Sequence, residues 1–157
     1  MVCRLNIVNK KKYPLTDELK NKLKKITQLV EENTSLDERK KWFLNLILVD
    51  EAESQQLNKQ YRQKNYPADV LTFPFACLYQ EKLNNCDNLG DIFLCYPIVK
   101  KQVHEFQVSF KEEICLIFTH GMLHLLGYDH QKEVEKKTMF ALQEKILIEI
   151  KYTKNFI

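Results

Sequence analysis

Glycine is scarce in this sequence. Only three of its 157 residues are glycine, namely Gly90, Gly121 and Gly127, whereas average usage is about 7%. Three glycines at these positions cannot form the motif G-x-G-x-x-G or the motif G-x-x-x-x-G-K-[ST]. The two commonest nucleotide-binding loops are therefore excluded, and we predict no nucleotide cofactor. The glycines that remain are expected where the backbone needs a conformation that other residues rarely adopt.

Other features are also missing. The five cysteines contain no C-x-x-C pair, and their odd number favours reduced thiols in a cytosolic protein: Cys3, Cys77, Cys86, Cys95 and Cys115. The first twelve residues lack the apolar stretch of a signal peptide, and no apolar run approaches the roughly 18 residues of a membrane span. We therefore expect a cytoplasmic protein without membrane association. The net charge of +3 indicates a mild preference for anionic partners.

No repeat, low-complexity tract or linker interrupts the chain, so we expect residues 1–157 to form a single domain. Alternating and apolar runs predict strands at 2–8, 42–49, 70–75 and 90–95. Apolar spacing, capping boxes and prolines predict helices at about 14–33, 50–61, 97–104, 109–126 and 131–152. This order predicts an α+β fold with a single mixed sheet of about four strands covered by about five helices. The helix at 109–126 is apolar on nearly every side, which favours a central position.

Three of the four histidines lie in one stretch, His120-Gly-Met-Leu-His124-Leu-Leu-Gly127-Tyr-Asp-His130. Helical residues four apart project from one face, so His120 and His124 can share a Zn²⁺ ion at about 2.0–2.1 Å. A continued helix would place His130 about 15 Å from His120, but Gly127 can adopt a positive φ and turn the chain back. We therefore predict one zinc ion per chain, with the open fourth position typical of catalytic sites. The alternative, ordinary packed histidines, needs this spacing to arise by chance, on the order of one in a thousand.

The spacing also matches the metzincin protease motif H-E-x-x-H-x-x-G-x-x-H, with one departure. Gly121 stands where those proteases carry the glutamate that takes a proton from water at the metal, which argues against peptide hydrolysis by that mechanism. No general base is identified in its place, and the bulk solvent, Asp91 and a substrate 2′-hydroxyl all stay open. A glycine at 121 would also leave room for a bulky phosphate.

The stretch from His120 to His130 closely resembles the signature of the YbeY family of bacterial rRNA maturation factors. Two further blocks fit the same family: Leu-Asn-Lys-Gln-Tyr-Arg at 57–62 followed by Pro-Ala-Asp-Val-Leu-Thr-Phe-Pro at 67–74, and Leu-Gly-Asp-Ile at 89–92. The similarity is strong from about residue 57 to residue 130. Its departures lie outside the presumed metal ligands: Ala68 for the usual Thr, Thr72 for the usual Ser, and Gln131 where an acidic residue is frequent.

The resemblance implies an α+β fold with a zinc site at the end of a cleft. It implies a zinc-dependent, single-strand-specific endoribonuclease that acts in late-stage maturation of the 16S rRNA 3′ end and in ribosome quality control. The expected partners are therefore single-stranded rRNA and the small ribosomal subunit. Within the family, the zinc ligands match His120, His124 and His130, and the arginine tied to activity matches Arg62. The alternative is a non-catalytic ribosome-assembly factor with a structural zinc site, which the missing base keeps open.

Two further residues have two interpretations each. Arg62 is one of only three arginines among 24 basic residues, and it marks either a place where a planar guanidinium binds phosphate or a salt-bridged surface position after a helix. Asp129 is either a carboxylate that orients a metal ligand or the cap of the helix expected from residue 131.

Overall fold

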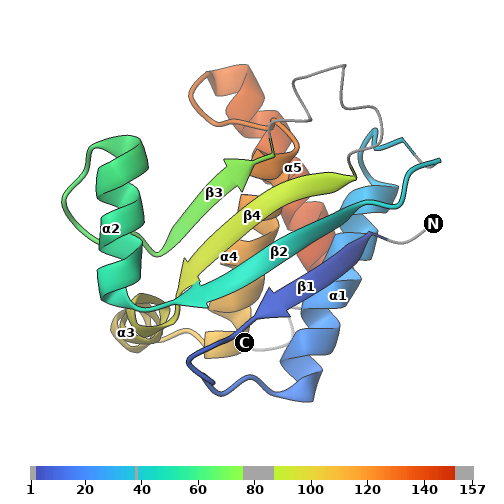
Figure 1. The fold of residues 1–157 in the computed structure, drawn as a ribbon. Coiled ribbons are helices and arrows are strands. Elements are labelled where there is room, and N and C mark those ends of the chain that lie inside the picture. Colours follow the sequence, from blue (N-terminus) through green and yellow to red (C-terminus); the bar gives the residue numbers. More distant parts are fainter. Residues whose placement is uncertain (1–2, 38, 76–86, 151–157) are drawn as a thin grey trace.

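The computed structural model describes residues 3–37, 39–75 and 87–150 (Figure 1). Its elements follow in the predicted order: β1 (Arg4–Val8), α1 (Asp17–Glu32), β2 (Phe43–Val49), α2 (Glu51–Arg62), β3 (Val70–Pro74), β4 (Asn88–Cys95), α3 (Tyr96–Phe106), α4 (Phe110–Leu125) and α5 (Glu133–Glu149). The prediction of an α+β fold with four strands and five helices is confirmed. Cys77, Cys86 and the expected end of the last helix at 151–152 lie outside the described residues, whose three cysteines are free thiols.

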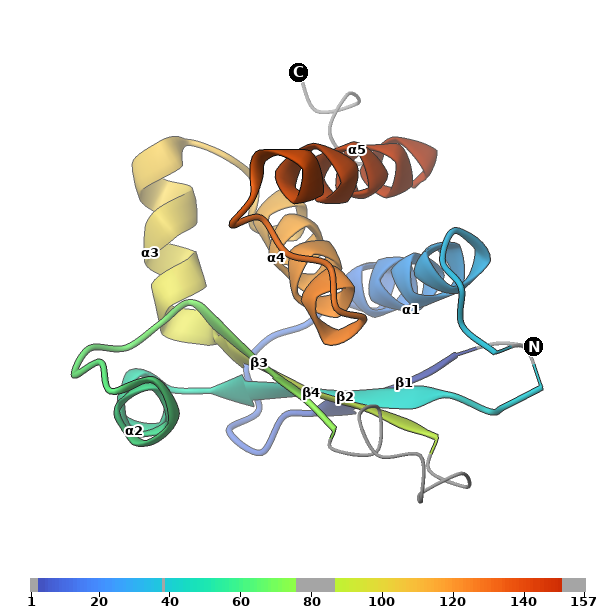
Figure 2. The same ribbon diagram turned by 90° about the horizontal axis from the view of Figure 1, so that it is seen from above.

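One mixed sheet carries the fold, with the strand order β1-β2-β4-β3. The first three strands are parallel, and β3 runs antiparallel to β4 at one edge. Alternate residues of β2 and β4 are buried on the face that α1 and α4 cover, among them Leu44, Leu46, Ile92 and Leu94. Figure 2 shows α1 and α4 on this face with α5 outside them, whereas α2 lies at the end of the sheet, away from that stack.

Helix α4 is the centre of the helical layer, as its apolar sequence predicts. It begins after Ser109, whose hydroxyl accepts a hydrogen bond from the Glu112 N–H at 3.0 Å. Nine of its residues are buried, and it packs against α1, α3, α5, β3 and β4. Its last two turns carry His120 and His124, so the position of these side chains depends on the whole core. In the parts of the chain described here, every helix is too short or too polar to cross a bilayer.

Gly90 is required by the pairing of β3 with β4. Its φ is +133°, and a β-carbon added there would lie 2.3 Å from the Phe73 carbonyl oxygen and 2.9 Å from the Phe75 nitrogen. Both neighbours are backbone atoms, one in β3 and one directly after it, so they cannot rotate aside. We expect Gly90→Ala to lower the free energy of unfolding by about 3 kcal/mol or more, measured by urea denaturation.

Gly127→Ala is the matched control for that variant. Gly127 also has a positive φ, +94°, but no atom lies within 4 Å of an added β-carbon. Only the backbone conformation is then unfavourable, which costs about 1 kcal/mol. An equal decrease in the free energy of unfolding of the two variants would show that collision with the backbone at β3 is not the reason for a glycine at position 90.

Candidate metal centre

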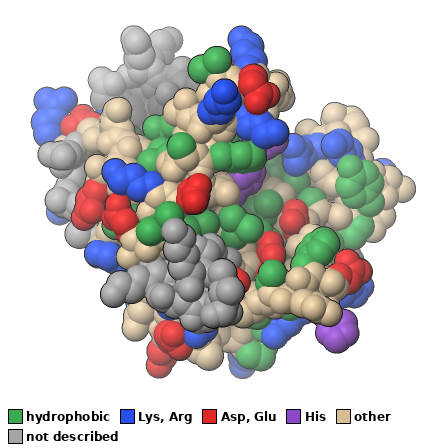
Figure 3. Space-filling model, turned by 180° about the vertical axis from the view of Figure 1, so that it is seen from behind, with side chains coloured by type: hydrophobic (Ala, Val, Ile, Leu, Met, Phe, Trp, Pro, Cys, Tyr) green, Lys and Arg blue, Asp and Glu red, His purple; other side chains and the backbone are tan. Residues whose placement is uncertain are grey.

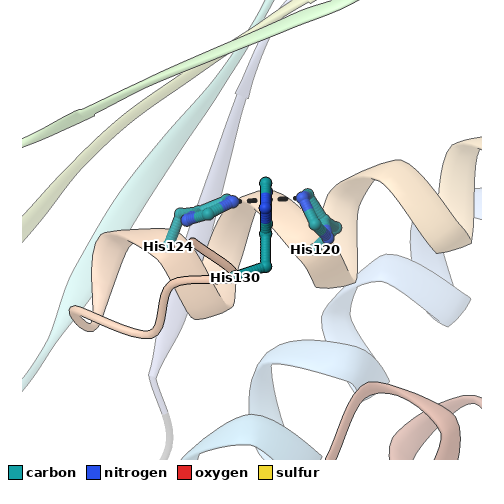
Figure 4. A group of neighbouring side chains, drawn as sticks. All are labelled: His120, His124 and His130. Atoms are coloured by element: carbon teal, nitrogen blue, oxygen red, sulfur yellow. Dashed lines mark hydrogen bonds between the residues drawn. The ribbon is translucent and has the colours of Figure 1, made fainter. Parts of the chain in front are cut away.

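Three imidazole rings meet at the end of α4, as the spacing predicts. The Nε2 atoms of His120 and His124 are 3.1 Å apart, and His130 joins them from the following loop, with one ligand nitrogen of each ring within 4.8 Å of the others (Figure 4). A tetrahedral ion at 2.0–2.1 Å from each nitrogen requires about 3.3 Å between ligand nitrogens. The cluster is therefore close to the geometry of a shared metal ion.

Gly127 performs the turn that brings His130 to the other two rings. Helix α4 ends at Leu125, and Gly127, with its positive φ, donates its N–H to the His124 carbonyl oxygen at 3.0 Å. Asp129 then accepts the His130 N–H at 2.7 Å. Because α5 begins only at Glu133, the interpretation of Asp129 as its cap is wrong. Asp129 instead holds the loop that presents His130.

Hydrogen bonds to the far side of two rings set which nitrogen faces the centre. His124 donates Nδ1–H to the Tyr128 carbonyl oxygen at 2.9 Å, and His120 donates Nδ1–H to Oε1 of Gln143 at 2.9 Å. Because these oxygens only accept hydrogen bonds, the Nε2 atoms of both neutral rings carry lone pairs. In this tautomer both Nε2 atoms, which lie 3.1 Å apart, can offer a lone pair to one cation. The donor set therefore fits a divalent metal that binds imidazole, such as zinc.

The protonation of these rings also favours metal binding. Burial lowers the pKa of His120, although the hydrogen bond to Gln143 acts in the opposite direction. Burial lowers the pKa of His124 as well, and the neighbouring His120 adds to this effect. Both rings are therefore neutral at pH 7, which is the form that binds a metal ion.

The lowered pKa values predict how the stability of the metal-free protein depends on pH. Since each folded-state pKa lies below the unfolded value of about 6.5, the stability that these rings contribute is complete above that pH and is lost as pH falls through the folded-state pKa. After chelation, we expect a lower free energy of unfolding at pH 5.5 than at pH 7.5. This difference in the free energy of unfolding between the two pH values should be smaller in the variant that carries both His120→Gln and His124→Gln. It should not change in the variant His104→Gln, since His104 is exposed. An unchanged difference in the double variant would contradict this cause.

Arg62 completes one side of the metal centre. It is the last residue of α2 and lines a hollow of about 200 Å³ together with the three histidines, Val70 and Thr72. Figure 3 shows histidine surface in a recess bordered by basic and hydrophobic side chains. Within residues 3–37, 39–75 and 87–150, no carboxylate forms an ion pair with Arg62, so the salt-bridge interpretation is wrong for the described chain. As far as the described residues are concerned, the guanidinium is available to bind an anion beside the histidines.

Asp91 does not belong to this centre. Its neighbour Ile92 faces α4, so Asp91 points to the opposite face of the sheet, where it accepts a hydrogen bond from Asn45 Nδ2 at 2.9 Å. It lines a separate cavity of about 870 Å³ beside α2. Asp91 is therefore excluded as a base at the histidine cluster.

Gly121 lies where α4 packs against β3 and β4. An added β-carbon would lie 3.3 Å from Cγ2 of Thr72 and 3.4 Å from Cγ2 of Ile92. The expectation that Gly121 makes room for a phosphate is therefore incomplete, because the missing side chain also allows close packing of helix on sheet. The glycine borders the hollow all the same, so no carboxylate enters it from this position.

Three residues near the centre were not identified as functional from the sequence. Gln143 binds His120, and the Phe140 ring lies 6.3 Å from the His120 ring and 6.2 Å from the His130 ring, centroid to centroid. Asp69 lines a cavity together with His120, Phe140 and Gln143. No local pattern marks Phe140 and Gln143, because both come from α5, whereas Asp69 lies in one of the blocks that carry the family resemblance.

Comparison with known proteins decides the family. A family model described as "Endoribonuclease YbeY" matches residues 6–151. The chain belongs to the YbeY family. A relative named Endoribonuclease YbeY from Ureaplasma parvum is 43% identical over 150 residues, which cover 95% of this chain and 93% of the relative. One of the same name from Fusobacterium nucleatum is 34% identical over 139 residues, with coverage of 88% and 83%.

A solved structure agrees with this assignment. The solution structure of TM1509 from Thermotoga maritima superposes with a TM-score of 0.60 at 34% identity, over 95% of this chain and 89% of that one. The predicted family is thus confirmed. Its membership supports an endoribonuclease role, which is a hydrolase activity, and does not favour the non-catalytic alternative.

Proposed function

We propose that this YbeY-family chain is a zinc-dependent endoribonuclease that hydrolyses phosphodiester bonds in single-stranded RNA. His120, His124 and His130 would hold one zinc ion. Arg62 would be the catalytic side chain beside it. The observation that carries the proposal is the cluster of three imidazole rings, with one ligand nitrogen of each within 4.8 Å of the others, in a hollow that Arg62 also lines.

The side chains of the centre divide the work between them. A zinc ion supplies a Lewis acid that polarises a phosphoryl oxygen and lowers the pKa of water. Gln143 and the Tyr128 carbonyl orient two of the rings through their Nδ1–H groups. Arg62 offers a bidentate donor to phosphate oxygens and neutralises the charge that develops on them. With Asp91 excluded, the bulk solvent and the substrate 2′-hydroxyl stay open as proton acceptors.

The family resemblance, rather than the geometry, supports a proposal for the biological substrate. We infer that the chain acts on the 3′ end of 16S rRNA in late-stage maturation and in ribosome quality control, with the small ribosomal subunit as partner. This places it in the cytoplasm, where those subunits are assembled. We also infer one domain over residues 1–157, which agrees with a family match to 6–151.

A cleavage assay tests this proposal. A labelled single-stranded rRNA fragment and the same fragment annealed to its complement are incubated with purified protein. We expect cleavage of the single strand alone, its loss after chelation and its return with zinc, because the bases of a duplex are paired and stacked and cannot be splayed out for recognition. A protein that binds zinc and small subunits but cuts no RNA would instead support the assembly-factor alternative.

A further inference from the structure

A second cavity adjoins the metal centre on the other side of His120. It measures about 290 Å³ and lies between β3, α4 and α5, and it shares His120 and Val70 with the hollow that contains Arg62. Its walls are mostly apolar, from Val70, Leu116 and Ile117. A volume at the lower end of the range for small-molecule sites suits one compact group rather than a long ligand.

The polar groups of this cavity differ from those of the metal centre. Its lining residues include no lysine or arginine, and their one ionisable acid is Asp69. A carboxylate repels phosphate, so the cavity suits an uncharged group with N–H donors. The Gln143 Oε1 is occupied by His120, and among the described residues the Gln143 amide nitrogen has no hydrogen-bond partner. The cavity therefore offers a donor in Gln143 and an acceptor in Asp69, whose oxygens also accept from the Val70 N–H at 2.8 Å and from Gln102 Nε2 at 3.3 Å.

Phe140 supplies an aromatic wall. The ring is 40% exposed, although it lies within 6.3 Å of the rings of His120 and His130, centroid to centroid. A nucleobase has apolar faces and an edge with both donors and acceptors, which matches an aromatic ring beside apolar walls and two polar groups. No other part of an RNA strand has this combination.

We propose that this cavity, the base cavity, receives one unstacked nucleobase next to the phosphate bound at the metal centre, with the base stacked on Phe140. The proposal rests on the proposed function. Since the two cavities share His120 and Val70, adjacent groups of one nucleotide can occupy both. A base in a duplex is paired and stacked, so this requirement gives a physical reason for a preference for single strands.

The test uses Phe140→Leu, which removes the ring and keeps an apolar side chain. We expect kcat/KM for single-stranded RNA to fall about tenfold, as for loss of one base–aromatic stack. Zinc content should not change, because Phe140 offers no ligand atom to a metal ion. Phe140→Trp should restore RNA cleavage. Phe106→Leu is the control, since Phe106 is 65% exposed at the end of α3 and lines neither cavity.

Abasic RNA tests the same contact from the substrate side. One abasic residue is placed in turn on each side of the mapped cut. At one of these positions, the missing base should lower the kcat/KM of the wild type about tenfold. It should not lower the kcat/KM of Phe140→Leu any further. Equal cleavage of abasic and intact RNA by the wild type, at every position tested, would overturn the base cavity.

If the wild type cuts no RNA, the proposed function fails, but the base cavity is still decided. Binding of RNA that contains 2-aminopurine then reports stacking directly through its fluorescence. Affinity about tenfold weaker in Phe140→Leu, with loss of quenching, would support the base cavity. Unchanged affinity and quenching would overturn it.

Discussion

Replacing His124 by alanine is expected to remove the bound metal and to lower RNA cleavage at least about 1000-fold. The variant leaves two of three ligands, and the lost ring is the one whose Nε2 lies 3.1 Å from that of His120. A metal ion held there would contribute several kcal/mol of transition-state stabilisation, and each 1.4 kcal/mol corresponds to about a factor of ten in rate. Metal per chain is measured by elemental analysis and cleavage by product formation on the labelled single strand.

His104→Ala is the control for that experiment, because His104 is exposed on α3 and lies outside the histidine cluster. It should keep its metal and its cleavage rate. Full metal content in His124→Ala would contradict the assignment of His124 as a ligand. Circular dichroism of both variants separates loss of the ion from loss of the fold.

Arg62→Ala is expected to lower kcat/KM by about 100- to 1000-fold while the metal is retained. This is the effect of removing a donor aimed at charge that develops in the transition state. Because Arg62 is exposed and forms no ion pair with another described residue, its removal should change the free energy of unfolding by no more than about 0.5 kcal/mol. Arg62→Lys should restore only part of the rate, since an ammonium group cannot bind phosphate bidentately.

Arg39→Ala removes the same charge at a distant place and is the matched control. Arg39 is exposed and pairs with Asp37 at 3.0 Å, and it lines neither cavity at the metal centre. An equal loss of cleavage from Arg39→Ala would indicate a general charge effect on RNA binding. Cleavage that persists in both Arg62→Ala and His124→Ala would indicate a contaminating nuclease.

Features that depend on a few neighbouring residues could be predicted well. The Asp50 and Glu53 pair forms both hydrogen bonds of a capping box at the start of α2, and Gly127 adopts the positive φ that the histidine spacing requires. Such features are governed by local backbone chemistry, which is the same in any fold. The start of α5 was placed two residues early, because its cap, Lys132, makes no side-chain hydrogen bond that a pattern could reveal.

Features that depend on packing between distant segments could not be predicted. Asp91 was an open candidate for the base, and its exclusion came only from the alternation of β4 against α4. Gln143 and Phe140 reach the histidines because the apolar side of α5 packs on α4, and neither residue has a distinctive neighbourhood in the sequence. Contacts of this kind are set by the burial of remote apolar surfaces.

The three glycines show where this division lies. The sequence by itself determined the histidine cluster, because two histidines one helical turn apart and a glycine before the third are enough to bring three rings together. Only the tertiary structure decided what surrounds them. Gly121 allows α4 to lie close to the sheet, and Gly90 allows β3 to pair there. The two contacts together place β3 beside the histidines, with Arg62 on one side and the base cavity on the other.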